Sequence, residues 1–121
     1  MQRRDFLRNG LVVSELIRNE EELLKRLLVV SLLQLELVQD GNMILLIQHL
    51  GLRQQLWNDF EALEQQLEPY KGIPPKRWDW QSTEERQLTV SALNRCRELM
   101  EKIRGNDLMS MMLLAKQKDK L

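Results

Sequence analysis

The chain has 121 residues, of which 43% are hydrophobic, 30% are charged and only 5% are aromatic. This composition is typical of one folded, water-soluble domain rather than of a disordered chain, and its excess of Leu, Glu, Gln, Lys and Arg favours helices over strands. The 18 basic and 18 acidic side chains cancel, so the net charge provides no attraction to nucleic acid or to anionic membranes, and neither is an expected partner.

The first residues include Arg3 and Arg4, a pair of the kind that begins an export signal. Such a signal would continue with a long uncharged apolar run, but charged residues return at Glu15 and Arg18. The longest apolar stretches are also much shorter than the about 20 residues of a membrane-spanning helix. We therefore expect a cytoplasmic protein that does not insert into membranes.

The first predicted element is a long helix over about residues 6–38. Its apolar residues keep the three- and four-residue spacing of one helical face. They are Val13, Leu16, Ile17, Leu23, Leu24, Leu27, Leu28, Leu35 and Val38. Residues 27–33 are apolar almost all round, which predicts that this part of the helix is covered on more than one side.

A turn at residues 40–42 separates this helix from a second one over about residues 43–67. Gly41 ends the first helix at little cost and Asn42 caps the second, so the two helices should pack antiparallel as an elongated hairpin. The predicted buried stripe of the second helix is His49, Leu52, Leu56, Phe60, Leu63 and Leu67, widened by Leu46, Leu50 and Trp57.

The linker over residues 69–81 contains three prolines and cannot be helical throughout. We expect Trp78 and Trp80, on either side of Asp79, to pack on the hairpin. Ser82 and Glu85 have the spacing of a capping box, in which Ser82 accepts a hydrogen bond from the Glu85 amide while Glu85 reaches back.

A third helix is predicted over about residues 83–104. Its buried face is Leu88, Ala92, Leu93, Cys96, Leu99, Met100 and Ile103. Gly105 should end this helix, and Asn106 and Asp107 should cap a short fourth helix over about residues 107–118. Residues 1–121 are therefore predicted to form a single all-α domain, a coiled-coil-like bundle of three or four helices.

No pattern of catalytic residues is present. His49 lies on the apolar stripe and has no Glu three residues before it, so we expect a hydrogen-bonded core histidine rather than a metal ligand. Cys96 is the only cysteine and lies on an inner face, where burial should raise the pKa of its thiol. Because no phosphate loop or metal motif occurs either, we predict a binding protein without catalytic residues, metal or cofactor.

Residues 108–115 contain three of the six methionines of the chain. A helix this short is not stable alone, so it must pack against the rest of the chain or against a partner. It can cap the open end of the bundle, or its flexible side chains can form an adaptable surface for the helix of a partner. The predicted partner-binding residues are Met100, Ile103, Leu108, Met109, Met111, Met112 and Leu113.

Several segments occur in a characteristic order: a long helix rich in Glu and Leu, the turn at residues 38–42, the Leu-rich segments 45–56 and 60–67, and the stretches 77–86, 95–100 and 110–119. In this order the chain resembles the FlgN-type flagellar export chaperones, in which a Gly-Asp turn joins two long helices. The resemblance covers nearly the whole chain.

The resemblance implies a cytoplasmic chaperone of type III protein export. Such a chaperone binds the amphipathic C-terminal helices of hook–filament junction proteins, prevents their premature assembly and delivers them to the export gate. The implied partners are therefore the helix of an export substrate and the export gate. The alternative is a self-associating coiled-coil protein, structural or adaptor, that forms a homodimer through residues 27–33.

Overall fold

The computed structural model describes the backbone of residues 2–73 and 80–119, and the side chains of residues 10–73 and 80–118. The chain is all-α, as predicted. Its elements are α1 (Gln2–Gln39), α2 (Met43–Leu67), the short 3-10 helix η1 (Glu68–Tyr70) and α3 (Thr83–Asp119). None of the described helices has an apolar stretch long enough to cross a membrane.

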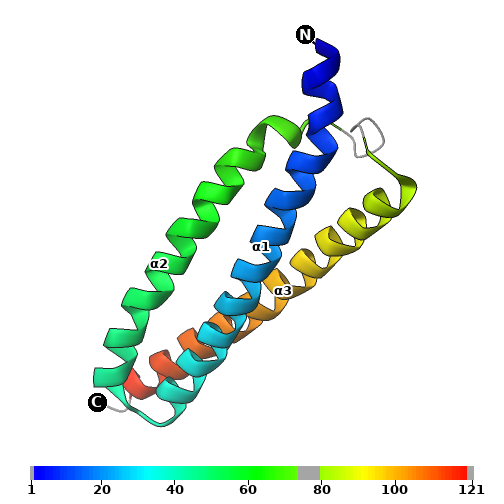
Figure 1. Ribbon diagram of the computed structural model, residues 1–121. Coiled ribbons are helices and arrows are strands. Elements are labelled where there is room, and N and C mark those ends of the chain that lie inside the picture. The colour runs from blue at the N-terminus through cyan, green and yellow to red at the C-terminus, as the bar shows by residue number, and fades with distance from the viewer. Residues whose placement is uncertain (1, 74–79, 120–121) are drawn as a thin grey trace.

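The helix α1 lies between the other two helices and packs against both (Figure 1). The turn at residues 40–41 makes α2 antiparallel to α1. The contacts of Cys96 with Ile17 and of Gln117 with Val38 show that α3 runs parallel to α1. In Figure 1, α2 and α3 converge toward the end that carries the α1–α2 turn and diverge toward the other end.

The core follows the three- and four-residue spacing of the apolar residues in each helix. It joins Val13, Ile17, Leu24 and Leu27 of α1 with Leu56, Phe60 and Leu67 of α2 and Ala92, Cys96 and Ile103 of α3. All nine residues predicted for the inner face of α1 are buried or half-buried. The long hairpin and its core-facing first helix are therefore confirmed.

The α1–α2 turn has the predicted chemistry. Gly41 has a φ of 68°, a left-handed conformation that glycine adopts without a steric penalty. Asn42 caps α2, because its Oδ1 accepts a hydrogen bond of 3.3 Å from the Leu45 amide. Both ends of α2 lie where the sequence predicted them.

Three residues that the sequence prediction placed on buried faces are exposed. Leu50 is 43% exposed, Leu52 is 51% exposed and Leu88 is 55% exposed. The three- and four-residue spacing of the inward positions places Arg53 between His49 and Leu56, and it places Thr89, which is buried, in line with Ala92. Arg53 bonds to Gln34 and Asp107, and Thr89 Oγ1 donates to the carbonyl oxygen of Glu85 in its own helix, so each can occupy the inward position.

The predicted break between a third and a fourth helix is also wrong, because α3 is continuous through Gly105, Asn106 and Asp107. These two polar side chains, expected to cap a new helix, instead bond to neighbouring helices. Asn106 Nδ2 donates to Ser31 Oγ of α1 at 3.1 Å, and Asp107 pairs with Arg53 of α2. Tertiary partners thus override the local preference for a helix end.

The start of α3 agrees with the predicted capping box. The Glu85 amide donates to Ser82 Oγ at 3.0 Å, and Glu85 Oε2 accepts a hydrogen bond of 3.0 Å from the Gln81 amide. Trp80 is half-buried and packs against the core, as expected. The predictions for Trp78 and Asp79 fall outside the described residues.

Candidate functional site

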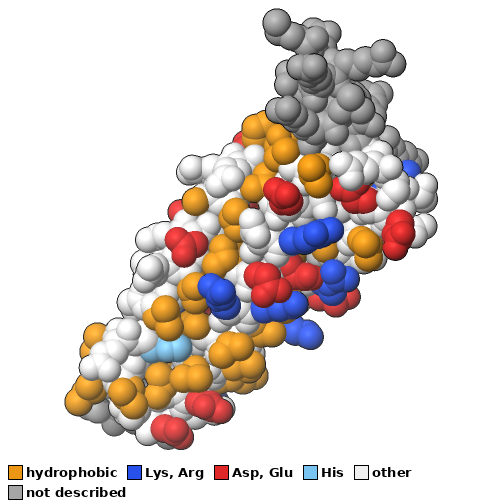
Figure 2. Space-filling view, viewed as in Figure 1, with side chains coloured by type: hydrophobic (Ala, Val, Ile, Leu, Met, Phe, Trp, Pro, Cys, Tyr) orange, Lys and Arg blue, Asp and Glu red, His pale blue; other side chains and the backbone are white. Residues whose placement is uncertain are grey.

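Exposed apolar side chains are concentrated at one end of the bundle, near the α1–α2 turn. Figure 2 shows those on one face of the molecule as an orange area around the pale-blue His49. Of the sixteen large apolar side chains that are exposed in the described part of the chain, thirteen lie in this group, which we call the apolar end. They are Val29, Leu32 and Leu33 of α1, Met43, Ile44, Leu45, Ile47, Leu50 and Leu52 of α2, and Leu108, Met109, Met111 and Met112 of α3.

The helical segments that form the apolar end carry no charge. Residues 27–35, 43–52 and 108–115 contain no Lys, Arg, Asp or Glu. The core uses only the inward positions of each segment, so the remaining apolar side chains face water on all three helices. An exposed apolar surface contributed by several elements is typical of a protein interaction site.

The predicted partner-binding residues divide into two groups. Leu108, Met109, Met111 and Met112 are exposed, and Met111 is the most exposed of them at 67%. Leu113 and Met100 are half-buried. Ile103 is only 1% exposed and belongs to the core, so the chain itself covers its side chain. The expected separate Met-rich helix is instead the last part of α3.

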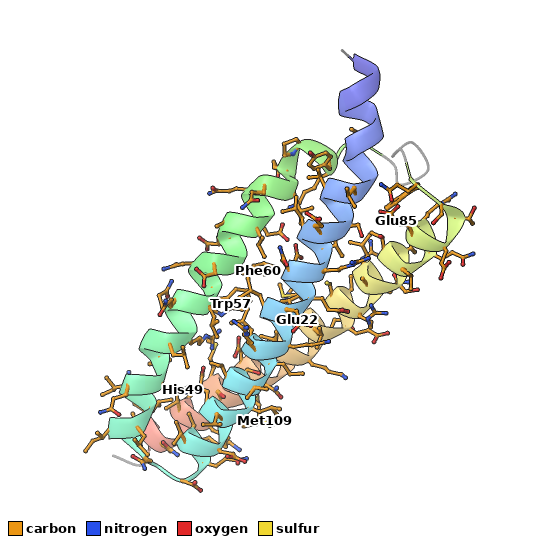
Figure 3. The ribbon with its side chains drawn as sticks, viewed as in Figure 1. Glu22, His49, Trp57, Phe60, Glu85 and Met109 are labelled. Carbon is orange, nitrogen blue, oxygen red and sulfur yellow. The ribbon has the colours of Figure 1, made fainter. Side chains whose placement is uncertain are left out.

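His49 has the structural role that was predicted for it. Its Nε2 lies 2.7 Å from the carbonyl oxygen of Val30 on α1. A carbonyl oxygen can only accept, so Nε2 carries the proton in this hydrogen bond. Figure 3 labels His49 on α2 and Met109 on α3 near the same end of the bundle. The histidine therefore joins α2 to α1 where the apolar end begins.

Arg53 is a residue that the sequence prediction missed. Its guanidinium donates to Gln34 of α1 at 2.7 Å and forms two hydrogen bonds with Asp107 of α3. It also lies 6.0 Å from the ring centre of Trp57, which packs edge-on against Phe60. Arg53 is four residues after His49 and three residues before Leu56, and this spacing could have predicted its inward position.

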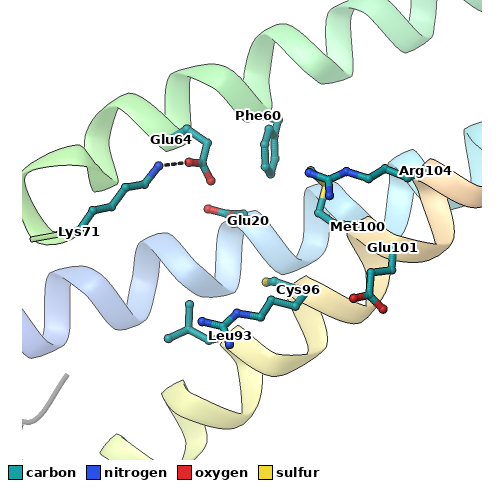
Figure 4. Close-up of a pocket in the computed structure, with 10 residues that line it drawn as sticks. Glu20, Phe60, Glu64, Lys71, Leu93, Cys96, Met100, Glu101 and Arg104 are labelled. Carbon is teal, nitrogen blue, oxygen red and sulfur yellow. Dashed lines mark hydrogen bonds and ion pairs between the residues drawn. The ribbon is translucent and has the colours of Figure 1, made fainter. Parts of the chain in front are cut away.

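A groove of about 520 Å³ lies between α2 and α3 in the half of the bundle away from the turn (Figure 4). The helix α1 forms its floor with Glu20, and α2 forms one wall with Phe60 and Glu64. The other wall is α3, with Leu93, Cys96 and Met100 inside the groove and Arg97, Glu101 and Arg104 also lining it. Lys71, just after η1, closes one end.

Glu20 on the floor of the groove is an unusual carboxyl group. Burial raises its pKa to about 8, and a hydrogen bond with the Glu64 carboxyl and repulsion from it add to the shift, while Lys71 opposes it. Two carboxyl groups can share a hydrogen bond only when one of them is protonated. Lys71 forms an ion pair with Glu64, and Oε2 of Glu20 is buried without a hydrogen-bond partner.

Cys96 behaves as the sequence predicted. Burial raises the pKa of its thiol to about 12, and the nearby carboxylates of Glu20 and Glu21 contribute. Its Sγ lies 4.0 Å from the carbonyl oxygen of Ile17. The thiol is therefore protonated at neutral pH and packs as a small apolar group.

Within the described residues, no three His, Cys, Asp or Glu side chains lie close enough together to hold a metal ion. Comparisons with protein-family models, with curated proteins and with solved structures give no match to this chain. The features that bear on function are therefore the apolar end and the groove between α2 and α3.

Proposed function

We propose that this chain is a helix-binding chaperone, whose apolar end holds an amphipathic helix of another protein. The observation that carries the proposal is the exposure of apolar side chains from all three helices at one end of the bundle. Burying apolar surface stabilises a complex by about 25 cal/mol per Å² before the costs of association. An amphipathic helix offers a matching apolar face of the required length.

The sequence resemblance narrows the proposed partner. The client would be the amphipathic C-terminal helix of a hook–filament junction protein, held in the cytoplasm before type III export. The uncharged, Met-rich part of α3 supports such a role, because flexible Met side chains adapt to helices of different shape. The export gate would be the second partner, to which the loaded chaperone delivers its client.

A second candidate function is self-association. The outward face of α1 exposes Val29, Leu32 and Leu33, and Val29 is 58% exposed. Two copies could cover these residues by packing their α1 helices together, as in a structural or adaptor coiled-coil protein. Light scattering of the isolated protein separates the candidates, since a stable dimer favours self-association and a monomer favours the chaperone.

The proposed function is tested by calorimetry with a synthetic peptide that has the sequence of a junction protein's C-terminal helix. Point variants are preferable to truncation at Gly105, because α3 is continuous and Gln117 bonds to Val38 of α1. We expect Met111→Glu to weaken binding at least about tenfold, since a charge at the interface would have to be desolvated.

The matched control is Leu88→Glu, which changes another exposed apolar residue of α3, outside the apolar end. This variant should bind the peptide as the unchanged protein does. If both variants bind with unchanged affinity, the apolar end is not the binding surface. If the unchanged protein binds no peptide and is a stable dimer, self-association replaces the chaperone as the proposed function.

A further inference from the structure

The arrangement of the helices leaves the position of a fourth helix open. Both α2 and α3 pack along α1, and they contact each other mainly near the Arg53–Asp107 pair. In the half of the bundle away from the turn, the space between them is the groove whose floor is Glu20. In a four-helix bundle the corresponding position is filled by another helix.

The two helix faces that line the groove can be followed toward the apolar end, past the Arg53–Asp107 pair. Residues seven apart lie on one strip of a helix. On α2, the strip that contains Glu64 continues toward the turn with Trp57, Leu50 and Met43. On α3, Arg97 and Arg104 are followed at the same interval by Met111. The strip that faces the groove thus changes from charged to apolar along its length, so a helix lying there would need one charged and one apolar half.

The charged half of the groove has two neighbouring carboxyl groups at its floor, although its lining as a whole has equal numbers of acidic and basic residues. Glu20 and Glu64 face each other from α1 and α2, and Lys71 is paired with Glu64. From α3, Arg97, Glu101 and Arg104 line the groove, and the Cys96 thiol lies at its wall. The carboxylate of Glu21, the next acidic residue of α1, forms an ion pair with Arg95. Glu20 Oε2 is therefore left buried without a donor.

We propose that the partner helix lies in the groove between α2 and α3 and places a Lys or Arg side chain against Glu20 and Glu64. This inference rests on the proposed function and names the chemistry of the helix that the protein selects. A docked helix removes water from both carboxyl groups, which is costly unless a cation replaces that water. A Lys or Arg supplies the hydrogen-bond donors that Glu20 Oε2 lacks.

Other residues at this position of the helix would fit less well. An acidic side chain would be repelled by Glu64 and would hold a third carboxyl group near the floor. A neutral side chain would leave Glu20 protonated and bonded to Glu64. Because a cation favours the ionised form of Glu20, docking of a basic helix should release the proton that Glu20 carries at neutral pH.

The test uses three designed amphipathic helical peptides with the same apolar face. They differ at one position on the border of that face, which is Lys, Gln or Glu. We expect the Lys peptide to bind about tenfold more tightly than the Gln peptide, and the Glu peptide to bind more weakly than both. Calorimetry at pH 7 in phosphate and in Tris should show release of about 0.5 to 1 proton for the Lys peptide only.

The same titrations with Glu20→Gln should show neither the preference for Lys nor proton release. Glu22→Gln is the matched control, because Glu22 is exposed on the same helix and should keep both. Thermal unfolding of both variants checks that they are folded. Loss of the preference in Glu20→Gln alone would support the inference.

Two contrary results have different meanings. If the three peptides bind equally well, or if Glu20→Gln keeps the preference for Lys, the inference about the groove is wrong, while helix binding stands. If none of the three peptides binds and the junction-protein peptide does not bind either, both the groove inference and the proposed function are wrong.

Discussion

Arg53 of α2 holds Asp107 of α3 through two hydrogen bonds, 2.9 Å from Nη1 to Oδ1 and 2.6 Å from Nη2 to Oδ2. The same guanidinium donates to Gln34 of α1, so one side chain joins all three helices. Each partner of the pair is only 22% exposed, and water therefore screens the pair weakly. This pair fixes the second half of α3 beside α2, between the groove and the apolar end.

The first prediction concerns this pair. Asp107→Asn keeps the shape of the side chain but removes its charge, which leaves the Arg53 cation poorly compensated. We expect the free energy of unfolding to fall by about 1–3 kcal/mol, as measured by urea denaturation. Glu22→Gln breaks an exposed pair with Lys25 and should cost less than about 0.5 kcal/mol. Equal small losses in the two variants would mean that the Arg53–Asp107 pair adds little stability.

Local sequence signals were sufficient to place α2, because Asn42 and Pro69 act on the helix ends next to them. The continuity of α3 was out of reach of such signals. Asn106 and Asp107 normally favour a helix start, and their partners Ser31 and Arg53 are 75 and 54 residues away in the sequence. A local pattern does not reveal that these side chains are already bonded within the bundle.

The candidate site was predicted in part. The exposed residues Met109, Met111 and Met112 stood out as a Met-rich segment, whereas Ile103 of the same predicted set lies in the core. In residues 43–52 seven of the ten positions are apolar, so the pattern predicts a helix without showing which strip faces inward. The role of Glu20 could not be predicted, because it depends on Glu64 and Lys71 being brought to the same groove.

Two glycines should respond in opposite ways to replacement by alanine. Gly105 lies inside α3 with space around it, so Gly105→Ala should stabilise the protein by about 0.5–1 kcal/mol. Gly41 has a φ of 68°, so Gly41→Ala should destabilise it by about 1–2 kcal/mol. Thermal unfolding measures both changes. A loss of stability in Gly105→Ala would contradict the continuous α3.

Cys96 should be protected from alkylation in the folded protein. The raised pKa of its thiol, about 12, leaves little reactive thiolate at pH 8, and burial limits access of the reagent. We expect iodoacetamide to react with the native protein at least about 100-fold more slowly than with the chain unfolded in urea. Mass spectrometry of the adduct follows the reaction. Equal rates in both states would show that the core around Cys96 opens readily.

The last prediction follows from the pKa of Glu20, which burial and Glu64 raise to about 8. Between its ordinary value and pH 8, the folded protein holds a proton on Glu20 that the unfolded chain has lost, so the contribution of Glu20 to stability must fall as the pH rises through this range. Glu20→Gln cannot lose such a proton, and it should be more stable than the unchanged protein by about 1–2 kcal/mol at pH 8, with little difference at pH 4. Urea denaturation at both pH values measures this difference.

The control is Glu61→Gln, which changes an exposed residue of α2. Its stability difference from the unchanged protein should be the same at both pH values. If the stability difference of Glu20→Gln is also the same at both pH values, Glu20 is ionised in the folded protein at neutral pH, and the Glu20 and Glu64 carboxyl groups do not share a proton.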